Sequence, residues 1–198
     1  TYGGKLAYMT FADNGVDYFK ATPGGLNHPI VSCFEEDSEG NLWIGTEGGG
    51  INRWDRRDGR FVYYTQESRC GLTSNMIKKL WHDGNDRLLV SAFNGGMRVF
   101  DERQGRFSDL HMNHPASGQP LSVYDFAKEG DRGIWLTDPD AELMYKDAST
   151  GRVETVRLTD AQGNAVRIHI ETLFHDERGN LWLVGHDGAS SIPPHGGF

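Results

Sequence analysis

The chain has 198 residues, 37% of them hydrophobic and 24% charged, a composition that predicts a globular protein and argues against a disordered one. Its formal net charge of −8 argues against nucleic acid or an anionic membrane surface as a partner. The 26 glycines are too many for a helical protein and indicate many tight turns, and no apolar run approaches the roughly 18 residues of a membrane span.

The sequence repeats itself with a period of 46 residues. Residues 1–26 align without gaps on residues 47–72 at this interval. The residues that recur include Gly59, Gly105 and Gly151, and also Trp43, Leu89 and Trp135, with Trp182 following after 47. A period of about 20 to 50 residues is typical of solenoids and propellers, so the chain is a candidate for such a fold.

Each period contains four short apolar runs, which in the best-preserved copy cover residues 30–36, 42–46, 51–55 and 61–65. The runs are rich in β-branched and aromatic residues and are bounded by Gly, Asp, Asn or Ser, as strands are. No window shows the stripe of an amphipathic helix. Four antiparallel strands per repeat of roughly 40 to 50 residues are typical of a propeller blade. The sequence therefore predicts an all-β fold, a β-propeller built of four-stranded antiparallel blades.

Taken in chain order, the runs divide residues 1–198 into about four blades within a single propeller segment. The predicted parts are the outer strands of a blade in 1–20, whole blades in 25–65, 71–109 and 120–157, and the inner strands of a last blade in 165–192. The inner strands themselves are expected near 30–36, 76–82, 122–128 and 168–175.

The second run of each copy, such as "LWIG" or "LWLVG", is apolar on both faces, as a strand covered on both sides would be. We therefore expect its Trp to act as a packing wedge between neighbouring blades, with ligand stacking as the alternative. Before this run, Asp37 and Gly40 have the chemistry of a tight reversal, and Asp176 and Gly179 repeat it. The two cysteines, Cys33 and Cys70, are interpreted as free thiols, with a disulfide as the alternative.

At this point the residues resemble a known family. The stretch "GLNHPIVSCFEEDSEGNLWIGTEGGGINRWD" closely resembles the two-component regulator propeller repeat, and "ETLFHDERGNLWLVGHDGASSI" resembles its core. In the copy that begins "GLTSNM" Leu89 replaces the Trp, and the copy from Leu121 to Asp147 diverges most, with "DPDAE" at 138–142 where glycines are expected.

The resemblance implies a function that the repeat alone does not. Such propellers are sensor modules outside the cytoplasm, commonly seven-bladed, and are tethered to histidine kinase or diguanylate cyclase outputs. It therefore implies a non-catalytic, ligand-sensing segment of a signal-transduction receptor, periplasmic or extracellular, with a small molecule or oligosaccharide as ligand. A scaffold for another protein is the alternative, and a propeller lyase a less favoured one.

Because strands alternate in direction within a blade, the loop that enters the first strand and the loop between the second and third emerge on the same face. Loops on a rigid scaffold often carry binding residues, so we expect a polar ligand-binding face there, suited to a neutral or cationic ligand. The candidate residues are Asn27, His28, Glu47, Asn75, Phe93, Asn94, Asp138, Asp140, His169, His186 and Asp187.

Other chemistry finds little support in the sequence. His111 and His114 have no third metal ligand at a useful spacing, so we interpret them as loop histidines and expect no metal. No nucleophile elbow and no phosphate-binding loop is present, and we expect neither catalytic residues nor a cofactor.

The phase of the two ends raises the question of closure. Residue 1 corresponds to Glu47 in the repeat, so the N-terminal part is expected to supply the third and fourth strands of a blade. Residues 181–185 correspond to the second strand of a blade. Three solutions stay open: a four-bladed ring closed by the terminal segments, two chains joined into one ring, or a piece of a longer propeller. We expect the last, together with self-association of the isolated chain, and contact with a membrane only through flanking segments.

Overall fold

The structure is a computed structural model, and it describes residues 6–9, 16–160, 162–185 and 188–193. Within these ranges every regular element is a β-strand except one short 3-10 helix, η1 (Gln66–Ser68). In the same ranges no helix is long and apolar enough to cross a membrane. The chain divides into two compact units, Thr1–Leu110 and His111–Phe198, each with its own sheets.

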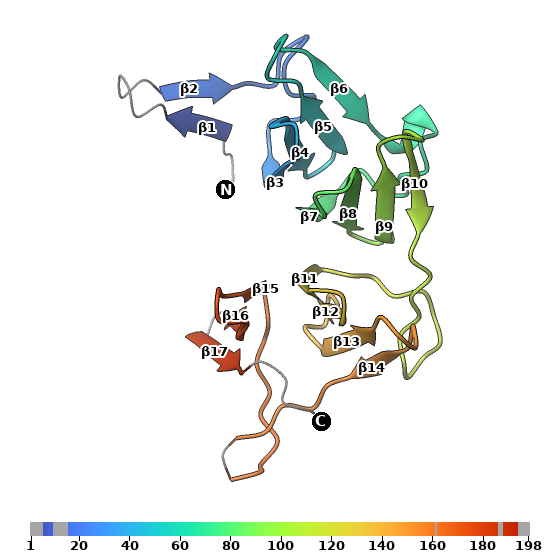
Figure 1. Cartoon of the computed structure of the whole chain (residues 1–198), viewed down its shortest axis with the longest axis vertical. Coiled ribbons are helices and arrows are strands. Elements are labelled where there is room, and N and C mark those ends of the chain that lie inside the picture. Colours follow the sequence, from blue (N-terminus) through green and yellow to red (C-terminus); the bar gives the residue numbers. More distant parts are fainter. Residues whose placement is uncertain (1–5, 10–15, 161, 186–187, 194–198) are drawn as a thin grey trace. The chain divides into compact units, whose positions relative to one another are not determined.

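The first unit contains a hairpin and two four-stranded sheets, all antiparallel (Figure 1). The hairpin joins β1 (Leu6–Met9) and β2 (Val16–Phe19). The first sheet contains β3 (Val31–Glu36), β4 (Leu42–Thr46), β5 (Ile51–Trp54) and β6 (Phe61–Tyr64) in sequence order. The second contains β7 (Ile77–His82), β8 (Arg87–Ala92), β9 (Gly96–Asp101) and β10 (Arg106–Asp109).

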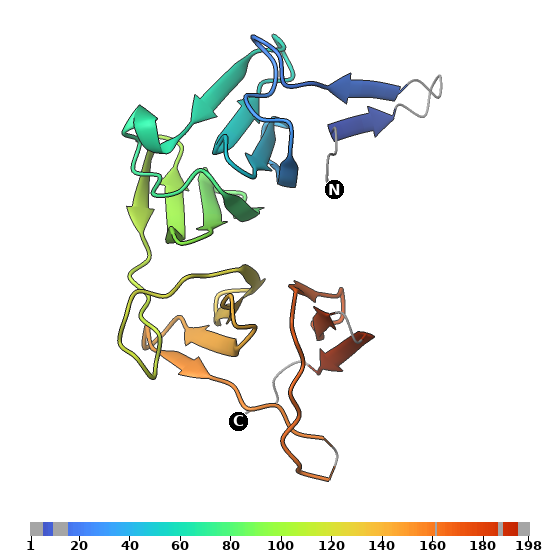
Figure 2. The ribbon, with the colours of Figure 1, turned by 180° about the vertical axis from the view of Figure 1, so that it is seen from behind.

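The second unit contains one four-stranded and one three-stranded antiparallel sheet, which Figure 2 shows from behind in yellow to red. The first contains β11 (Asp125–Glu129), β12 (Gly133–Thr137), β13 (Leu143–Asp147) and β14 (Val153–Thr155). The second contains β15 (Thr172–His175), β16 (Leu181–Gly185) and β17 (Gly188–Ile192). The predicted four-stranded antiparallel blades and the all-β class are thus confirmed.

Three details differ from the sequence-based expectation. β11 and β15 begin later than predicted, because the residues before them lead in from connecting loops. The amides of Tyr124 and Glu171, just before these strands, already bond to Thr137 and Val184, at 2.7 and 2.8 Å. The last sheet also has a third strand, β17, which pairs with β16 along its whole length. The sequence had suggested inner strands alone for this blade, and the "GASSI" run is too polar to stand out as a strand.

Apolar side chains of neighbouring sheets build the core of each unit. In the first unit Trp43 is fully buried, lies 5.5 Å from Tyr64 of its own sheet and 5.3 Å from Phe100 of the next one, measured between ring centroids. In the second, Trp135 is buried in one cluster with Leu173 and Leu181 of the following sheet. Trp43 and Trp135 therefore pack as wedges between neighbouring blades, as predicted.

The turn acid before each of these strands holds the Trp in place. Asp37 Oδ1 accepts the backbone N–H of Glu39 and Asn41, at 3.0 and 2.8 Å, and its Oδ2 accepts the indole N–H of Trp43 at 3.0 Å. The indole N–H of Trp182 donates in the same way to Asp176 Oδ2, at 3.0 Å. Each turn thus ties the reversal of the chain to the Trp of the strand that follows it.

Candidate functional site

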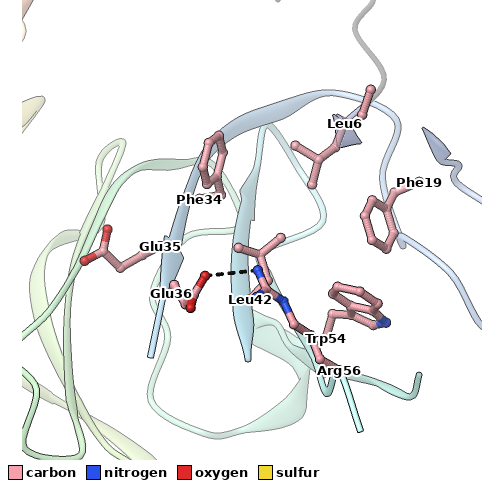
Figure 3. A pocket seen from close by; sticks show the side chains of 9 residues that line it. Leu6, Phe19, Phe34, Glu35, Glu36, Leu42, Trp54 and Arg56 are labelled. Atoms are coloured by element: carbon pink, nitrogen blue, oxygen red, sulfur yellow. Dashed lines mark hydrogen bonds and ion pairs between the residues drawn. The ribbon is translucent and has the colours of Figure 1, made fainter. Parts of the chain in front are cut away.

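Each unit contains a cavity that is large enough for a small ligand. The cavity of the first unit, about 580 Å³, lies between the β1–β2 hairpin and the β3–β6 sheet (Figure 3). Its apolar lining consists of Leu6, Ala7, Phe19, Phe34, Leu42 and Trp54. Phe19 stands edge-on to Trp54 at 4.8 Å, and an ion pair of 3.0 Å between Arg56 and Glu36 borders the cavity.

Comparison with the later sheets indicates that this first cavity is a blade face that no neighbouring four-stranded sheet covers among the described residues. Phe34 pairs with the strand-two residue Ile44, and the corresponding residues of the later sheets are Leu80, Phe126 and Leu173. Phe34 is 60% exposed, whereas the other three are 4%, 1% and 0% exposed. Since the residue that corresponds to Phe34 is buried by packing in each of the three later sheets, we interpret this cavity as a packing surface and not as a ligand site.

The cavity of the second unit, about 860 Å³, differs from the first because both acidic and basic side chains line it from several segments. Its walls are the turn 138–142 between β12 and β13, the segment 155–158 after β14, the segment 165–170 before β15, and His114. Among the lining residues are Asp138, Asp140 and His169, which the sequence had proposed as site residues. We refer to this cavity as the β12–β15 pocket.

The acidic wall of the β12–β15 pocket is a rigid turn. Asp138 is 7% exposed, and its Oδ1 accepts the backbone N–H of Asp140 at 3.0 Å and of Glu142 at 2.9 Å. Ala141 takes a left-handed conformation, with φ of 62°. In the first copy of the repeat a glycine-rich loop, 47–50, occupies this place, so the divergent "DPDAE" sequence is what brings three carboxyl groups to the pocket.

His114 reaches the same wall from the loop between β10 and β11. Its Nε2 lies 3.0 Å from Glu142 Oε2 and 4.0 Å from Asp138 Oδ2. Its Nδ1 accepts the backbone N–H of Ala116 at 3.2 Å, so Nε2 carries the proton of the neutral ring and donates it toward Glu142.

These three residues also form a group that could hold a metal ion, because one ligand atom of each lies within 4.8 Å of the others. A metal on His114 Nε2 would require the ring proton at Nδ1, where the N–H of Ala116 already donates. The geometry therefore favours a hydrogen-bonded acid–histidine cluster over a metal centre.

The opposite wall of the β12–β15 pocket is basic. It is formed by a hairpin in which the N–H of Val166 donates to the C=O of Leu158 at 2.9 Å and Thr159 pairs with Ala165. Both views of the ribbon show the two arms of this hairpin next to each other, in orange (Figure 1 and Figure 2). Arg157 and Arg167 line the pocket from these arms.

The predicted site residues of the first unit are held by contacts within the protein. Asn27 and Asn52 exchange two hydrogen bonds of 2.9 and 2.8 Å, and Glu47 pairs with Lys78 at 3.0 Å. The amide oxygen of Asn75 accepts the N–H of Gln66 at 2.8 Å.

The remaining predicted residues of this unit serve turns and packing. His28 Nδ1 accepts the N–H of Ile30 at 3.2 Å, the ring of Phe93 lies 5.7 Å from Lys78 Nζ, and Asn94 occupies a turn with φ of 54°. These contacts position loops, and no cavity described in the first unit gathers these residues. His186 and Asp187 lie outside the described residues.

Sequence reasoning therefore identified part of the β12–β15 pocket and missed the rest. His114 had been interpreted as a loop histidine, and Glu142, Arg157 and Arg167 had not been singled out. The available signal was the departure from the repeat: "DPDAE" replaces a glycine loop, and the connection from β14 to β15 is long enough to form its own hairpin.

The fold and the repeat both have relatives. Residues 25–48 match the family model described as two component regulator propeller. Histidine kinase P4 of Formosa agariphila is 23% identical over 171 residues, which is 82% of this chain and 12% of that protein.

Among solved structures, the extracellular domain of the hybrid two component system BT4673 from B. thetaiotaomicron superposes with a TM-score of 0.74 at 21% identity, over 98% of this chain and 27% of that chain. The corresponding domain of BT3049 gives 0.56 at 13% identity, over 88% and 28%. The chain therefore spans less than a third of the length of each of these relatives.

The superposed structures share the arrangement of strands described above. The sequence had suggested a family of sensor propellers, and the matched region contains Asp37, Gly40 and Trp43 of the best-preserved copy. Residues 25–48 are thus identified as a two-component regulator propeller repeat, in a chain folded as a β-propeller of four-stranded antiparallel blades.

Proposed function

We propose that the chain is a non-catalytic, ligand-binding propeller segment of a signal-transduction receptor, located outside the cytoplasm. The output in this proposal is a histidine kinase, hybrid two-component or diguanylate cyclase module elsewhere in the receptor. The observation that carries the proposal is the β12–β15 pocket, because it gathers Asp138, Asp140 and His169 into a cavity of about 860 Å³. That volume lies within the range of about 300 to 1,000 Å³ in which small-molecule sites are found.

The relatives support the receptor part of the proposal. One is a histidine kinase, and two are extracellular domains of hybrid two component systems. A polar pocket with several fixed carboxyl groups suits a ligand with many hydroxyl groups, since each carboxylate oxygen accepts hydrogen bonds from them. We therefore propose an oligosaccharide as the ligand.

A saccharide and small-molecule array, followed by calorimetry on each hit, tests the proposal. We expect the Asp140→Asn substitution to weaken binding by about 10-fold, because a charged hydrogen-bond acceptor is lost at an exposed rim. Asp131→Asn is the matched control: Asp131 is also exposed but lies in the turn between β11 and β12, outside the pocket, and should bind like the unmodified chain.

Other outcomes would support the competing functions. Turnover of a bound compound would favour a lyase. Retention of a protein partner by a chain that binds no small molecule would favour a scaffold. Equal loss of binding in Asp140→Asn and Asp131→Asn would place the ligand outside the β12–β15 pocket.

A further inference from the structure

Two arginines of the β12–β15 pocket have no partner among the residues that the structure describes. Arg157 and Arg167 are exposed and line the pocket, and neither forms an ion pair or side-chain hydrogen bond with any residue in the described ranges. Arginines beside other turns of the protein differ, because they have acidic partners. Arg87 Nε, for example, lies 2.6 Å from Asp83 Oδ2. The positive charge on this wall is therefore available to a ligand.

The backbone places the two arginines close to each other. Leu158 and Val166 are bonded across the hairpin at 2.9 Å, and each arginine is the next residue outward on its arm. Their neighbours Val156, Leu158 and Ile168 pack against the apolar cluster of the unit, so the arms keep their apolar residues on the core side. Two like charges on adjacent arms repel each other, and a shared anion would relieve this repulsion.

The ligand must also satisfy the acidic wall. Asp138 and Asp140 would repel a purely anionic molecule, but Asp138 is locked by two backbone N–H groups and its Oδ2 can still accept hydrogen bonds. The described residues that line the pocket include no Phe, Tyr or Trp, so it offers no platform on which an aromatic base would stack. A single amino acid would leave most of a cavity of about 860 Å³ unfilled.

We infer that the β12–β15 pocket binds a saccharide that carries an acid group, with the carboxylate or sulfate held by Arg157 and Arg167 and the hydroxyl groups held by Asp138 and Asp140. A guanidinium presents its N–H groups as a planar fork that matches both anions. The inference rests on the proposed function and sharpens it, because the sequence alone had suggested a neutral or cationic ligand.

The test compares three disaccharides in calorimetry with the full 198-residue chain at low salt. One carries a hexuronate, the second a single sulfate, and the third is the neutral, carboxyl-reduced form of the first. We expect at least one acidic disaccharide to bind about 10-fold or more tightly than the neutral one, and its affinity to fall with added salt. The hexuronate and sulfate arms identify which anion the site takes.

Charge-removing variants assign the effect to the two arginines. Arg157→Gln and Arg167→Gln should each weaken the acidic disaccharide by about 10-fold and leave the neutral one unchanged. Arg152→Gln is the matched control, because Arg152 is exposed in the turn between β13 and β14 and does not line the pocket. Circular dichroism and the melting temperature check that all three variants remain folded.

Failure of the inference can be told apart from failure of the proposed function. If the neutral disaccharide binds as tightly as the acidic ones, and the two variants bind like Arg152→Gln, the acid-group inference is overturned and the saccharide pocket stands. If none of the three disaccharides binds, or a free amino acid binds in their place, the inference and the saccharide proposal are overturned together.

Discussion

At the scale of single residues, the fold depends on a contact between the turn acid and the wedge Trp. In two of the sheets an Asp side chain six residues before the Trp accepts its indole N–H, and in the β11–β14 sheet Glu129 takes that role for Trp135, at 3.2 Å. Where Leu89 replaces the Trp, the acid at the same turn, Asp83, instead accepts from Arg87 Nε at 2.6 Å. A buried indole needs an acceptor, so the Trp and the acid belong together.

The Asp37→Asn substitution tests this contact. It leaves Oδ1 to accept the backbone amides but turns an NH₂ group toward the Trp43 N–H, so two donors face each other in a buried site. We expect the free energy of unfolding to fall by about 1–3 kcal/mol, measured by urea denaturation.

The matched control is Asp83→Asn, which changes the same turn in a copy without a Trp. Because its partner Arg87 is mostly exposed, the expected loss is below about 1 kcal/mol. Equal losses in the two variants would contradict the role assigned to the indole.

The turn acids also predict how stability depends on pH. Hydrogen bonds from Asn180 and from the Trp182 indole hold the pKa of Asp176 at about 2, against 3.8 for an ordinary Asp. A carboxyl group whose pKa is lowered in the folded state contributes its full stabilisation at pH values above its unfolded-state pKa. This contribution is lost as the pH falls toward the folded-state pKa. We therefore expect the urea midpoint to decline between about pH 4 and pH 2, and Asp176→Asn to flatten this part of the profile. An unchanged profile in the variant would assign the decline to other groups.

At the scale of elements, the candidate site lies where the chain departs from its own repeat. The β4–β5 loop of the first blade is Glu47 followed by three glycines, and it serves the contact with Lys78. The β12–β13 turn, 138–142, has the same position in its blade but supplies a rigid acidic wall. In the proposed function, a common scaffold thus carries a binding site through the change of one loop.

A loop exchange tests the separation of scaffold and site. We expect a chain in which residues 139–142 are replaced by the aligned glycine-rich sequence of 47–50 to keep its β-sheet spectrum and to lose ligand binding, because the strands on both sides are unaltered. The reciprocal exchange at 47–50 should leave binding unchanged. Retained binding in the first chimera would exclude the acidic wall from the site.

At the scale of the whole molecule, an exposed apolar blade face predicts association. Phe34 is 60% exposed at a position that is buried in the other sheets, and it borders an apolar cavity with Leu42 and Trp54. Apolar faces of this kind are covered in stable proteins, either by the rest of the same chain or by another molecule.

We expect light scattering to show concentration-dependent self-association of the isolated chain, and Phe34→Glu to reduce it. Val62→Glu is the control, because Val62 is exposed on the outer strand β6 and does not line the cavity. A monomer at all concentrations would contradict the expectation and would favour closure of the chain on itself.

The sequence by itself determined the blades. The period of 46, the apolar runs and the Asp–Gly turns are local patterns, and strand pairing between neighbours in sequence follows from them; β17 was missed because "GASSI" has no apolar signal. Only the tertiary structure decided which polar residues line the candidate site. His114, Asp138 and Arg167 lie far apart in the sequence and meet through loops whose paths the repeat does not encode, whereas Asn27, Glu47 and Asn75 belong to the same predicted face and are used by the fold itself. The hydrogen bonds and ion pairs that each side chain makes in the folded chain settle that difference, and the repeat pattern does not specify them.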